Sequence, residues 1–287
     1  MVRLYLEGMP VAIVLATILV VAWLAGEPLW TARRRKRLRQ TPLPAEWRGI
    51  IERNVPYLAR LPAGLRARVE GHVQVFMREK NFVGCDGLVI TDEVRVTIAA
   101  QACLLVANRE SYYFPRVRDI LVYPSAFVVE RVTGGPMLQT DSTRVLSGES
   151  WTHGQVVLSW SDALHGAAID DDGRNVVIHE FAHQLDQEKG YANGAPWLGR
   201  RARYPRWSHV MSAEFARLQY SAAAGEPSLF SAYGATEPAE FFAVVSEAFF
   251  ERPRIFAVLH PALYEELRGV YRVDPRSFDW SDQPPVT

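Results

Sequence analysis

The chain has 287 residues with 32 basic and 32 acidic side chains, so its formal net charge at pH 7 is zero. Its length allows one large domain or two small ones, and a composition of 48 % hydrophobic and 22 % charged residues excludes a disordered chain. The neutral balance argues against nucleic acid as a partner, because proteins that bind it usually carry a basic excess. Two cysteines are too few for a disulfide framework.

The charge is concentrated at the N-terminus. Residues 1–40 carry a net charge of +5, and residues 41–287 carry −5. An uncharged run of 19 residues from Gly8 to Gly26 would span about 30 Å as a helix. Six basic residues follow within 33–39, which is typical of a cytoplasmic flank. We therefore predict a transmembrane anchor over 1–40 (helix about 8–26), with the rest of the chain at the cytoplasmic face of the membrane. A buried helix and a cleaved signal peptide are the alternatives.

The segments after the anchor alternate between helical and extended patterns, and no repeat is present. Helical spacing of apolar residues predicts helices over 45–80 with a break at Pro62, and then over 92–110, 174–188, 207–223, 237–250 and 261–271. Branched and aromatic residues predict strands over 81–90, 119–132 and 154–164, while 133–153 is rich in turn residues. Because helices outnumber strands, and the strands precede the central helices, we predict an α+β fold.

One helix carries a pattern typical of metal chemistry. His179, Glu180 and His183 form an HExxH motif, in which the two histidines lie on one face of the helix and can share a zinc ion. Glu180 can then act as a general base on a metal-bound water. Asp171 or Asp172 could cap this helix. The alternative, two unrelated histidines on a charged surface helix, is disfavoured by the apolar residues around the motif.

A catalytic zinc requires a third protein ligand. His209 and His260 are candidates, but the helix over 237–250 offers a better one. Glu240 and Glu247 are the acidic residues on an otherwise apolar face of that helix, and Glu240 has the more apolar surroundings. A solvated edge of an amphipathic helix is the alternative for both, and it fits Glu247 better.

Four segments, 120–129, 147–160, 176–186 and 231–250, give the chain a resemblance to a known family. It resembles the Mlc titration factor A family of zinc peptidases, which is similar to the catalytic domain of anthrax lethal factor. The resemblance implies a compact zincin-like metallopeptidase domain over 41–287, with many helices and a small mixed sheet. It also implies one Zn²⁺ per chain on His179, His183 and Glu240, with Glu180 activating water. Tyr233 would face the metal as a second catalytic residue, donating a hydrogen bond to the oxyanion or protonating the leaving amine.

The function implied by this resemblance is hydrolysis of peptide bonds in a peptide or protein substrate, with aminopeptidase-like action as one form. With the predicted anchor, the site of action would be the cytoplasmic face of a bacterial inner membrane. The alternative is a regulatory module that sequesters a transcriptional repressor of the Mlc type, with a structural zinc. The segment 154–160 resembles the edge strand on which zincins bind substrate, so Val157, Leu158 and Ser159 are predicted substrate contacts. A buried core strand is the alternative. Asp186, three residues after His183, either supports the metal site or ends the helix.

Overall fold

A computed structural model describes Ile13, Thr17, Trp23 and residues 26–109, 113–125, 127–130, 143–146, 148–151 and 154–280. The chain divides into two compact units, Met1–Pro42 and Leu43–Thr287. Each unit is described by itself below.

The first unit is helical over residues 26–40. This helix contains six basic side chains, and Arg34 stacks over the exposed ring of Trp30 at 5.5 Å. Within the described residues, no helix is both long enough and apolar enough to cross a bilayer. This finding contradicts the predicted single-pass location in an inner membrane. Most of the predicted span over 8–26 lies outside the described residues.

The second unit contains a small mixed sheet with strand order β1-β2-β6-β5. Its strands are β1 (Asn81–Gly84), β2 (Asp119–Tyr123), β5 (Gly148–Trp151) and β6 (Gln155–Ser159). The first three in spatial order run parallel, and β5 pairs antiparallel with β6, Glu149 opposite Val157. Strands β3 (Phe127–Glu130) and β4 (Thr143–Leu146) form a separate antiparallel pair.

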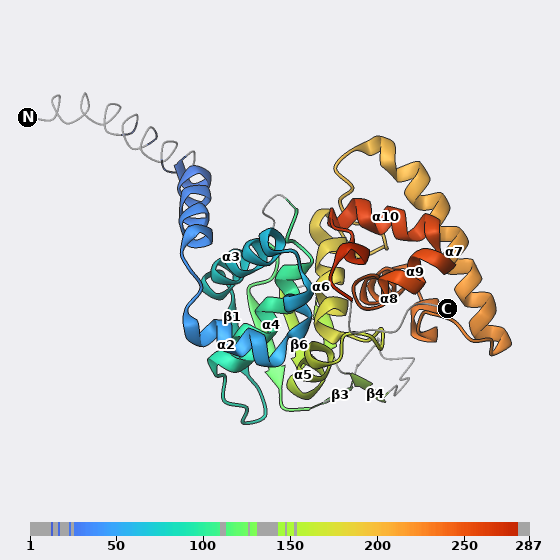
Figure 1. The fold of residues 1–287 in the computed structure, drawn as a ribbon, viewed down its shortest axis with the longest axis horizontal. Helices are drawn as coiled ribbons and strands as arrows, with labels where there is room; N and C mark the ends of the chain where they lie inside the picture. The colour runs from blue at the N-terminus through green and yellow to red at the C-terminus, as the bar shows by residue number, and fades with distance from the viewer. Residues whose placement is uncertain are drawn as a thin grey trace, which may run out of the picture. The chain divides into compact units, whose positions relative to one another are not determined.

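Helices make up most of the second unit. They are α2 (Ala45–Asn54), α3 (Ala63–Glu79), α4 (Asp92–Leu104), α5 (Trp160–Ala168), α6 (Val176–Asp186), α7 (Tyr204–Ala224), α8 (Pro238–Glu251), α9 (Pro253–Leu259) and α10 (Pro261–Tyr271). The described residues also form five 3₁₀ turns: η1 (Pro56–Arg60), η2 (Gln187–Lys189), η3 (Arg201–Arg203), η4 (Ala232–Ala235) and η5 (Pro275–Ser277). Helix α6 packs against α4 on one side and α8 on the other (Figure 1). The predicted combination of many helices with a small sheet is confirmed.

Several boundaries differ from the predicted ones for local reasons. Strand β6 ends at Ser159, whose hydroxyl accepts a hydrogen bond from the N–H of Asp162 and so starts α5 where a longer strand was predicted. The turn-rich region before β6 contains β4 and β5, which the turn residues concealed. Thr91 caps α4, since its hydroxyl accepts a hydrogen bond from the N–H of Val94.

Helix α6 is anchored in the core by an aromatic cluster. The ring of Phe181 lies 5.6 Å from that of Phe76 and 4.7 Å from that of Phe114, both in edge-on contact. All three side chains are buried. Full burial of one such ring contributes roughly 1.5–3 kcal/mol, so the cluster fixes the rotation of α6 about its axis.

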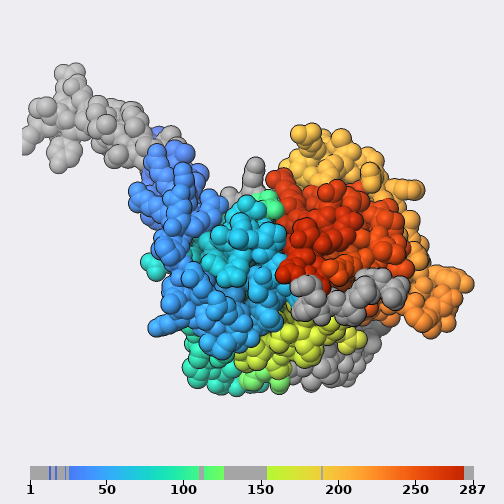
Figure 2. Space-filling model, viewed as in Figure 1, coloured from blue at the N-terminus to red at the C-terminus, as the bar shows by residue number. Residues whose placement is uncertain are grey.

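The C-terminal segment closes over η1. Phe278 and Trp280 each pack edge-on against Tyr57 with ring centroids 5.9 Å apart. The N–H of Asp279 donates to the carbonyl of Arg60 at 2.9 Å, and the Arg60 guanidinium lies 5.0 Å from the Trp280 ring. The early and late segments of this unit are therefore neighbours, as the blue and red surfaces of Figure 2 show.

Candidate metal centre

Helix α6 places His179 and His183 one turn apart, with ring centroids separated by 4.9 Å. The helix starts at Asn175, whose side-chain oxygen accepts a hydrogen bond of 3.0 Å from the N–H of Ile178. Asn175 is therefore the cap, and the predicted caps at Asp171 and Asp172 lie too early in the chain. Because the cap fixes the first turn, it also fixes where His179 points.

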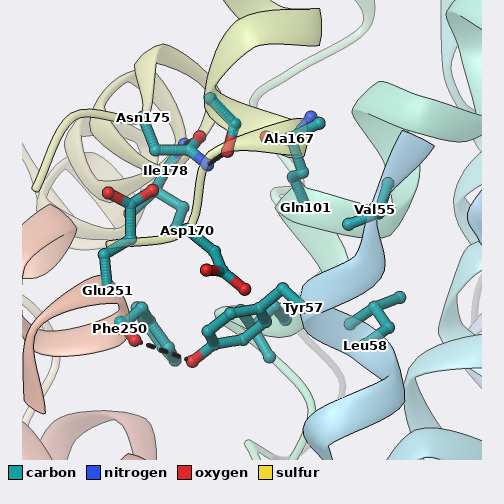
Figure 3. Close-up of a pocket in the computed structure, with 12 residues that line it drawn as sticks. Val55, Tyr57, Leu58, Gln101, Ala167, Asp170, Asn175, Ile178, Phe250 and Glu251 are labelled. Carbon is teal, nitrogen blue, oxygen red and sulfur yellow. Dashed lines mark hydrogen bonds between the residues drawn. The ribbon is translucent and has the colours of Figure 1, made fainter. Parts of the chain in front are cut away.

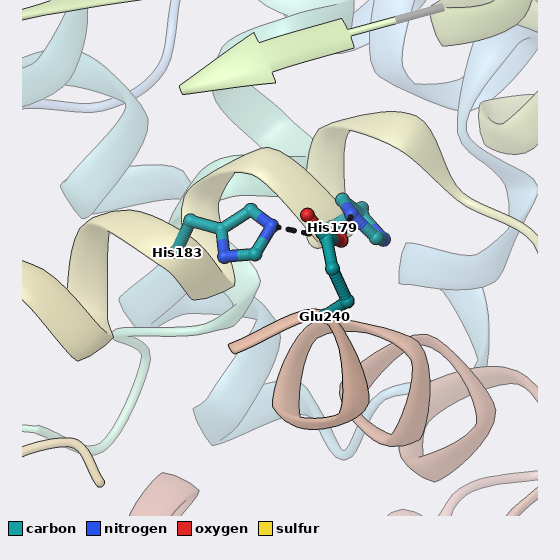
Figure 4. Close-up of side chains that lie close together, drawn as sticks. All are labelled: His179, His183 and Glu240. Atoms are coloured by element: carbon teal, nitrogen blue, oxygen red, sulfur yellow. Dashed lines mark hydrogen bonds and ion pairs between the residues drawn. The ribbon is translucent and has the colours of Figure 1, made fainter. Parts of the chain in front are cut away.

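Helix α8 brings Glu240 to the two histidines. One oxygen of its carboxylate, Oε2, lies 3.0 Å from Nε2 of His179 and 3.3 Å from Nε2 of His183 (Figure 4). His179 and Glu240, which these two helices bring together, are 61 residues apart in the sequence. The structure therefore brings together the three residues predicted to bind zinc.

The geometry and chemistry of this cluster fit a metal ion. The three donor atoms lie within 4.8 Å of one another. Tetrahedral zinc with bonds of about 2.0–2.1 Å separates neighbouring ligand atoms by about 3.3 Å. The two observed separations of 3.0 and 3.3 Å match that value, and two imidazoles with one carboxylate form a usual zinc ligand set. Small side-chain adjustments would complete the site.

Glu247, two turns beyond Glu240 on α8, orients the first histidine. Nδ1 of His179 donates to Oε1 of Glu247 at 2.7 Å, and the N–H of Asn175 donates to Oε2 at 2.6 Å. Both carboxylate oxygens are therefore used, and the side chain is 10 % exposed. A carboxylate on the far nitrogen of a metal-binding histidine fixes its tautomer and leaves Nε2 free to bind metal.

The charges of the cluster are strongly coupled. Burial alone would lower the pKa of His179, but the carboxylates of Glu247 and Glu240 raise it well above its usual value. Burial alone would raise the pKa of Glu240, but hydrogen bonds and positive charge from His179 and His183 hold it well below its usual range. The metal-free cluster therefore pairs an imidazolium with carboxylates, and a metal ion would take the place of the proton on Nε2.

The two predicted catalytic residues lie beside this cluster. Glu180 follows His179 on α6, is 4 % exposed, and its charge contributes to the raised pKa of His179. The Tyr233 ring, in η4, lies 6.0 Å from the ring of His179. Its backbone is held on both sides, because its N–H donates to Ser231 and its carbonyl accepts from the hydroxyl of Thr236 at 2.8 Å.

The predicted substrate strand has no free edge. Strand β6 lies between β2 and β5, and Val157 pairs with Leu121 on one side and Glu149 on the other. Val157, Leu158 and Ser159 are all buried, and the Ser159 hydroxyl is engaged in capping α5. The prediction of an edge strand is wrong because β5, within a region that appeared to be all turns, covers that edge.

The remaining candidates lie away from the cluster. His209 is exposed on α7, and His260 is buried and paired with Glu214 at 2.7 Å. Asp186, the last residue of α6, accepts hydrogen bonds from three successive backbone N–H groups, those of residues 193–195. It contributes no donor atom to the group of three.

A family model described as glucose-regulated metallo-peptidase M90 matches residues 29–272. The chain belongs to this family. An uncharacterized protein of Synechocystis, slr2042, is 42 % identical over 271 residues, which cover 93 % of this chain and 98 % of that protein. Mlc titration factor A of Salmonella agona is 34 % identical over 225 residues, covering 77 % of this chain and 84 % of the relative. The same factor of Salmonella arizonae is 32 % identical over 235 residues, covering 80 % and 92 %.

This M90 protein also contains a cavity behind the start of α6 (Figure 3). It has a volume of about 310 Å³, including space open to solvent, and its lining includes Tyr57, Asp170, Asn175 and Glu251. Burial, followed by the charges of Glu247 and Asp172, raises the pKa of Glu251 well above its usual value. None of the three clustered donors lines this cavity, so it is separate from the candidate metal centre.

Sequence reasoning left the role of Glu247 open and missed Asn175. The spacing of seven residues between Glu240 and Glu247 places both on one helical face, which is the signal for Glu247. An asparagine directly before the apolar run of α6 is the signal for the cap. Neither signal says that Glu247 binds both the N–H of Asn175 and Nδ1 of His179, because that depends on how α6 and α8 pack.

Proposed function

We propose that this member of the M90 family is a zinc-dependent peptidase that hydrolyses peptide bonds, with His179, His183 and Glu240 as the metal ligands. The observation that carries the proposal is the convergence of these three donors beside the buried Glu180. Zinc bound there would polarise the substrate carbonyl and lower the pKa of a coordinated water. Aminopeptidase-like action is one form of this activity.

The roles of the neighbouring side chains follow from their chemistry. The Glu180 carboxylate would accept the proton of the attacking water and pass it to the leaving amine. The Tyr233 phenol would donate a hydrogen bond to the oxyanion that develops on the substrate. Glu247 would hold His179 in one tautomer throughout, because its hydrogen bond occupies Nδ1.

The sheet suggests where a peptide substrate would lie. Among the described strands, β5 has β6 as its single neighbour, and β5 also packs against α6. A peptide could pair with the outer edge of β5 as an added strand. This arrangement replaces the predicted contacts at Val157, Leu158 and Ser159, which are buried in β6 between β2 and β5.

A Glu180→Gln variant tests the reaction. It should bind zinc like the wild type and lose at least about 100-fold in hydrolysis of a mixed peptide library, because the amide cannot accept the proton. Glu266→Gln is the matched control, since Glu266 on α10 is also buried but pairs with Arg206 of α7 at 2.7 Å. Equal hydrolysis by the wild type and the Glu180 variant would refute the proposed mechanism.

A second candidate function rests on the names of two relatives, each called Mlc titration factor A. Under this alternative, the chain would sequester a transcriptional repressor of the Mlc type, and the metal would be structural. Binding of purified Mlc by the wild type, Glu180→Gln and His179→Ala, measured by calorimetry, separates the two functions. Binding that survives Glu180→Gln in a chain without peptidase activity would favour sequestration.

A further inference from the structure

The carboxylate of Asp186 organises the loop that follows the histidine helix. Its Oδ2 accepts hydrogen bonds from the N–H groups of Asn193 and Gly194 at 2.7 and 2.6 Å, and Oδ1 accepts one from Ala195 at 2.8 Å. Asp186 is 4 % exposed. Three charge-assisted hydrogen bonds from successive residues define the position of this stretch relative to the end of α6.

The middle residue of this stretch lies against the first turn of α8. Gly194 has a φ of +77°, and a Cβ added to it would lie 2.5 Å from the carbonyl oxygen of Pro238. A side chain therefore does not fit between the loop and α8, and only glycine allows the two backbones to approach so closely. Pro238 is the first residue of α8 and precedes Glu240 by two positions.

A second contact ties the same loop to α8. The indole N–H of Trp207 donates to the carbonyl of Gly194 at 3.0 Å. The buried Trp207 ring packs edge-on against Phe242, with centroids 5.9 Å apart. Glu240 lies between Pro238 and Phe242 in the sequence, so both contacts bracket the third donor of the metal centre.

We infer that Asp186 is a positioning residue for the metal centre: it holds residues 193–195 as a stop for the first turn of α8, and this stop sets the distance between Glu240 and the two histidines. The inference rests on the proposed zinc site and adds a residue to it. Asp186 thus connects the end of the helix that carries His183 to the start of the helix that carries Glu240. A shift of the first turn of α8 would move the Glu240 carboxylate directly, because metal–ligand bonds tolerate only about 0.2 Å of error.

Two variants disturb this stop in different ways, and a third is a control. Asp186→Asn keeps the size of the side chain but removes its charge and one acceptor oxygen. Gly194→Ala leaves Asp186 intact and pushes the loop against Pro238. Gly199→Ala is the control, because Gly199 lies in the same loop and its φ of +81° is similar to that of Gly194, so alanine strains the backbone at both positions. The Cβ added at Gly199 would meet only a side-chain nitrogen of Arg272, at 3.9 Å, and would not press on α8.

Zinc affinity, measured by competition with a chromogenic chelator, is the readout, with the melting temperature of each metal-free variant recorded alongside. We expect Asp186→Asn and Gly194→Ala to weaken zinc binding by about 10- to 100-fold, the range seen when outer-shell partners are lost. Gly199→Ala should lower the melting temperature and keep the wild-type affinity. Wild-type affinity in both Asp186→Asn and Gly194→Ala would overturn the inference while leaving the zinc site in place.

The Glu240→Ala background shows whether the effect passes through Glu240. There, Gly194→Ala should change the residual zinc affinity of the two histidines by less than about twofold, because the residue that the stop positions is gone. An undiminished effect in that background would overturn the inference. A wild-type chain that binds no zinc would refute the proposed function itself, which is a different result from either of these.

Discussion

Two histidine–carboxylate pairs in this protein have the same hydrogen-bond length and different surroundings. Nδ1 of His179 and Nδ1 of His260 each lie 2.7 Å from a carboxylate oxygen, of Glu247 and Glu214 respectively. On the ring of His179, Nε2 faces a second carboxylate that also meets another histidine. The ring of His260 instead packs on Phe230, 4.5 Å away between centroids.

The comparison shows that a carboxylate on one nitrogen orients an imidazole but does not make a metal site. A metal site also requires further donors that converge on the opposite nitrogen. Within the described part of the chain, the group of His179, His183 and Glu240 meets this requirement, and the pair at His260 belongs to no such group. The His260 pair instead supports the packing of Phe230, three residues before Tyr233.

Removing each histidine should give the largest contrast. His179→Ala should weaken zinc binding by more than the roughly 100-fold that outer-shell losses reach, because a ligand itself is removed. His260→Ala should keep zinc affinity and lower the free energy of unfolding by about 1–3 kcal/mol, since it leaves the Glu214 carboxylate without its buried partner. Metal titration and chemical denaturation of both variants measure this. Retention of tight zinc binding by His179→Ala would contradict the assignment.

Replacing the carboxylate of each pair by an amide should give a smaller difference in zinc affinity than removing the histidines. Glu247→Gln should weaken zinc binding by about 10- to 100-fold, because the amide can donate to Nδ1 and so favour the wrong tautomer. Glu214→Gln should leave zinc affinity within about twofold and reduce stability only. The same titration measures both, and equal zinc affinities for the two variants would show that Glu247 has no role in orienting His179.

The metal-free protein should show a pH dependence that comes from the cluster. The pKa of His179 is raised in the folded state, so its stabilising contribution is complete below the unfolded value near 6.5 and is lost as the pH rises through the folded value. The pKa of Glu240 is lowered, so its contribution is present above the unfolded value near 4.5 and is lost on acidification below that.

Denaturation of the metal-free chain between about pH 6 and pH 9 should therefore show stability that falls with rising pH. His179→Gln should remove the part of this slope that is due to the cluster, while His260→Gln should keep it. A slope that is the same in the wild type and in His179→Gln would mean that the imidazolium is not stabilised by its carboxylates.

The smallest effect on stability should come from removing Arg217, which lies beside the pair of His260 and Glu214. Arg217 lies 3.8 Å from Glu214, but its side chain is 59 % exposed. Because exposed ion pairs contribute roughly 0–1 kcal/mol, Arg217→Ala should change stability by less than about 0.5 kcal/mol and leave zinc affinity unchanged. A larger loss in urea denaturation would show that the pair needs this third charge.

Local spacing explains which parts of the site could be predicted. His179 and His183 share a helical face at any packing of the helix, and Glu240 stands out as an acid among apolar neighbours. The Glu247 carboxylate binds both the N–H of Asn175 and Nδ1 of His179. These contacts depend on the packing of α6 against α8, which the spacing within one helix does not predict. The edge position of β6 failed for a similar reason, since its neighbour β5 is four residues long and lies among turn residues.

The prediction of a membrane location from the N-terminal sequence was wrong. A long uncharged run is a strong signal for a membrane span, but most of that run lies outside the described residues, and no helix within them is long and apolar enough to cross a bilayer. At the other end of the chain, the region of similarity to the M90 family ends at residue 272.

That boundary has a practical consequence for the segment that closes over η1. Phe278 and Trp280 lie beyond residue 272, and both are buried against Tyr57. Loss of one buried aromatic side chain typically costs about 3–5 kcal/mol, and whole domains are stable by only about 5–15 kcal/mol. A recombinant fragment limited to the region of family similarity would therefore lack Phe278 and Trp280 and have an incomplete core. The shortest fragment worth crystallising runs from Leu43 to at least Trp280.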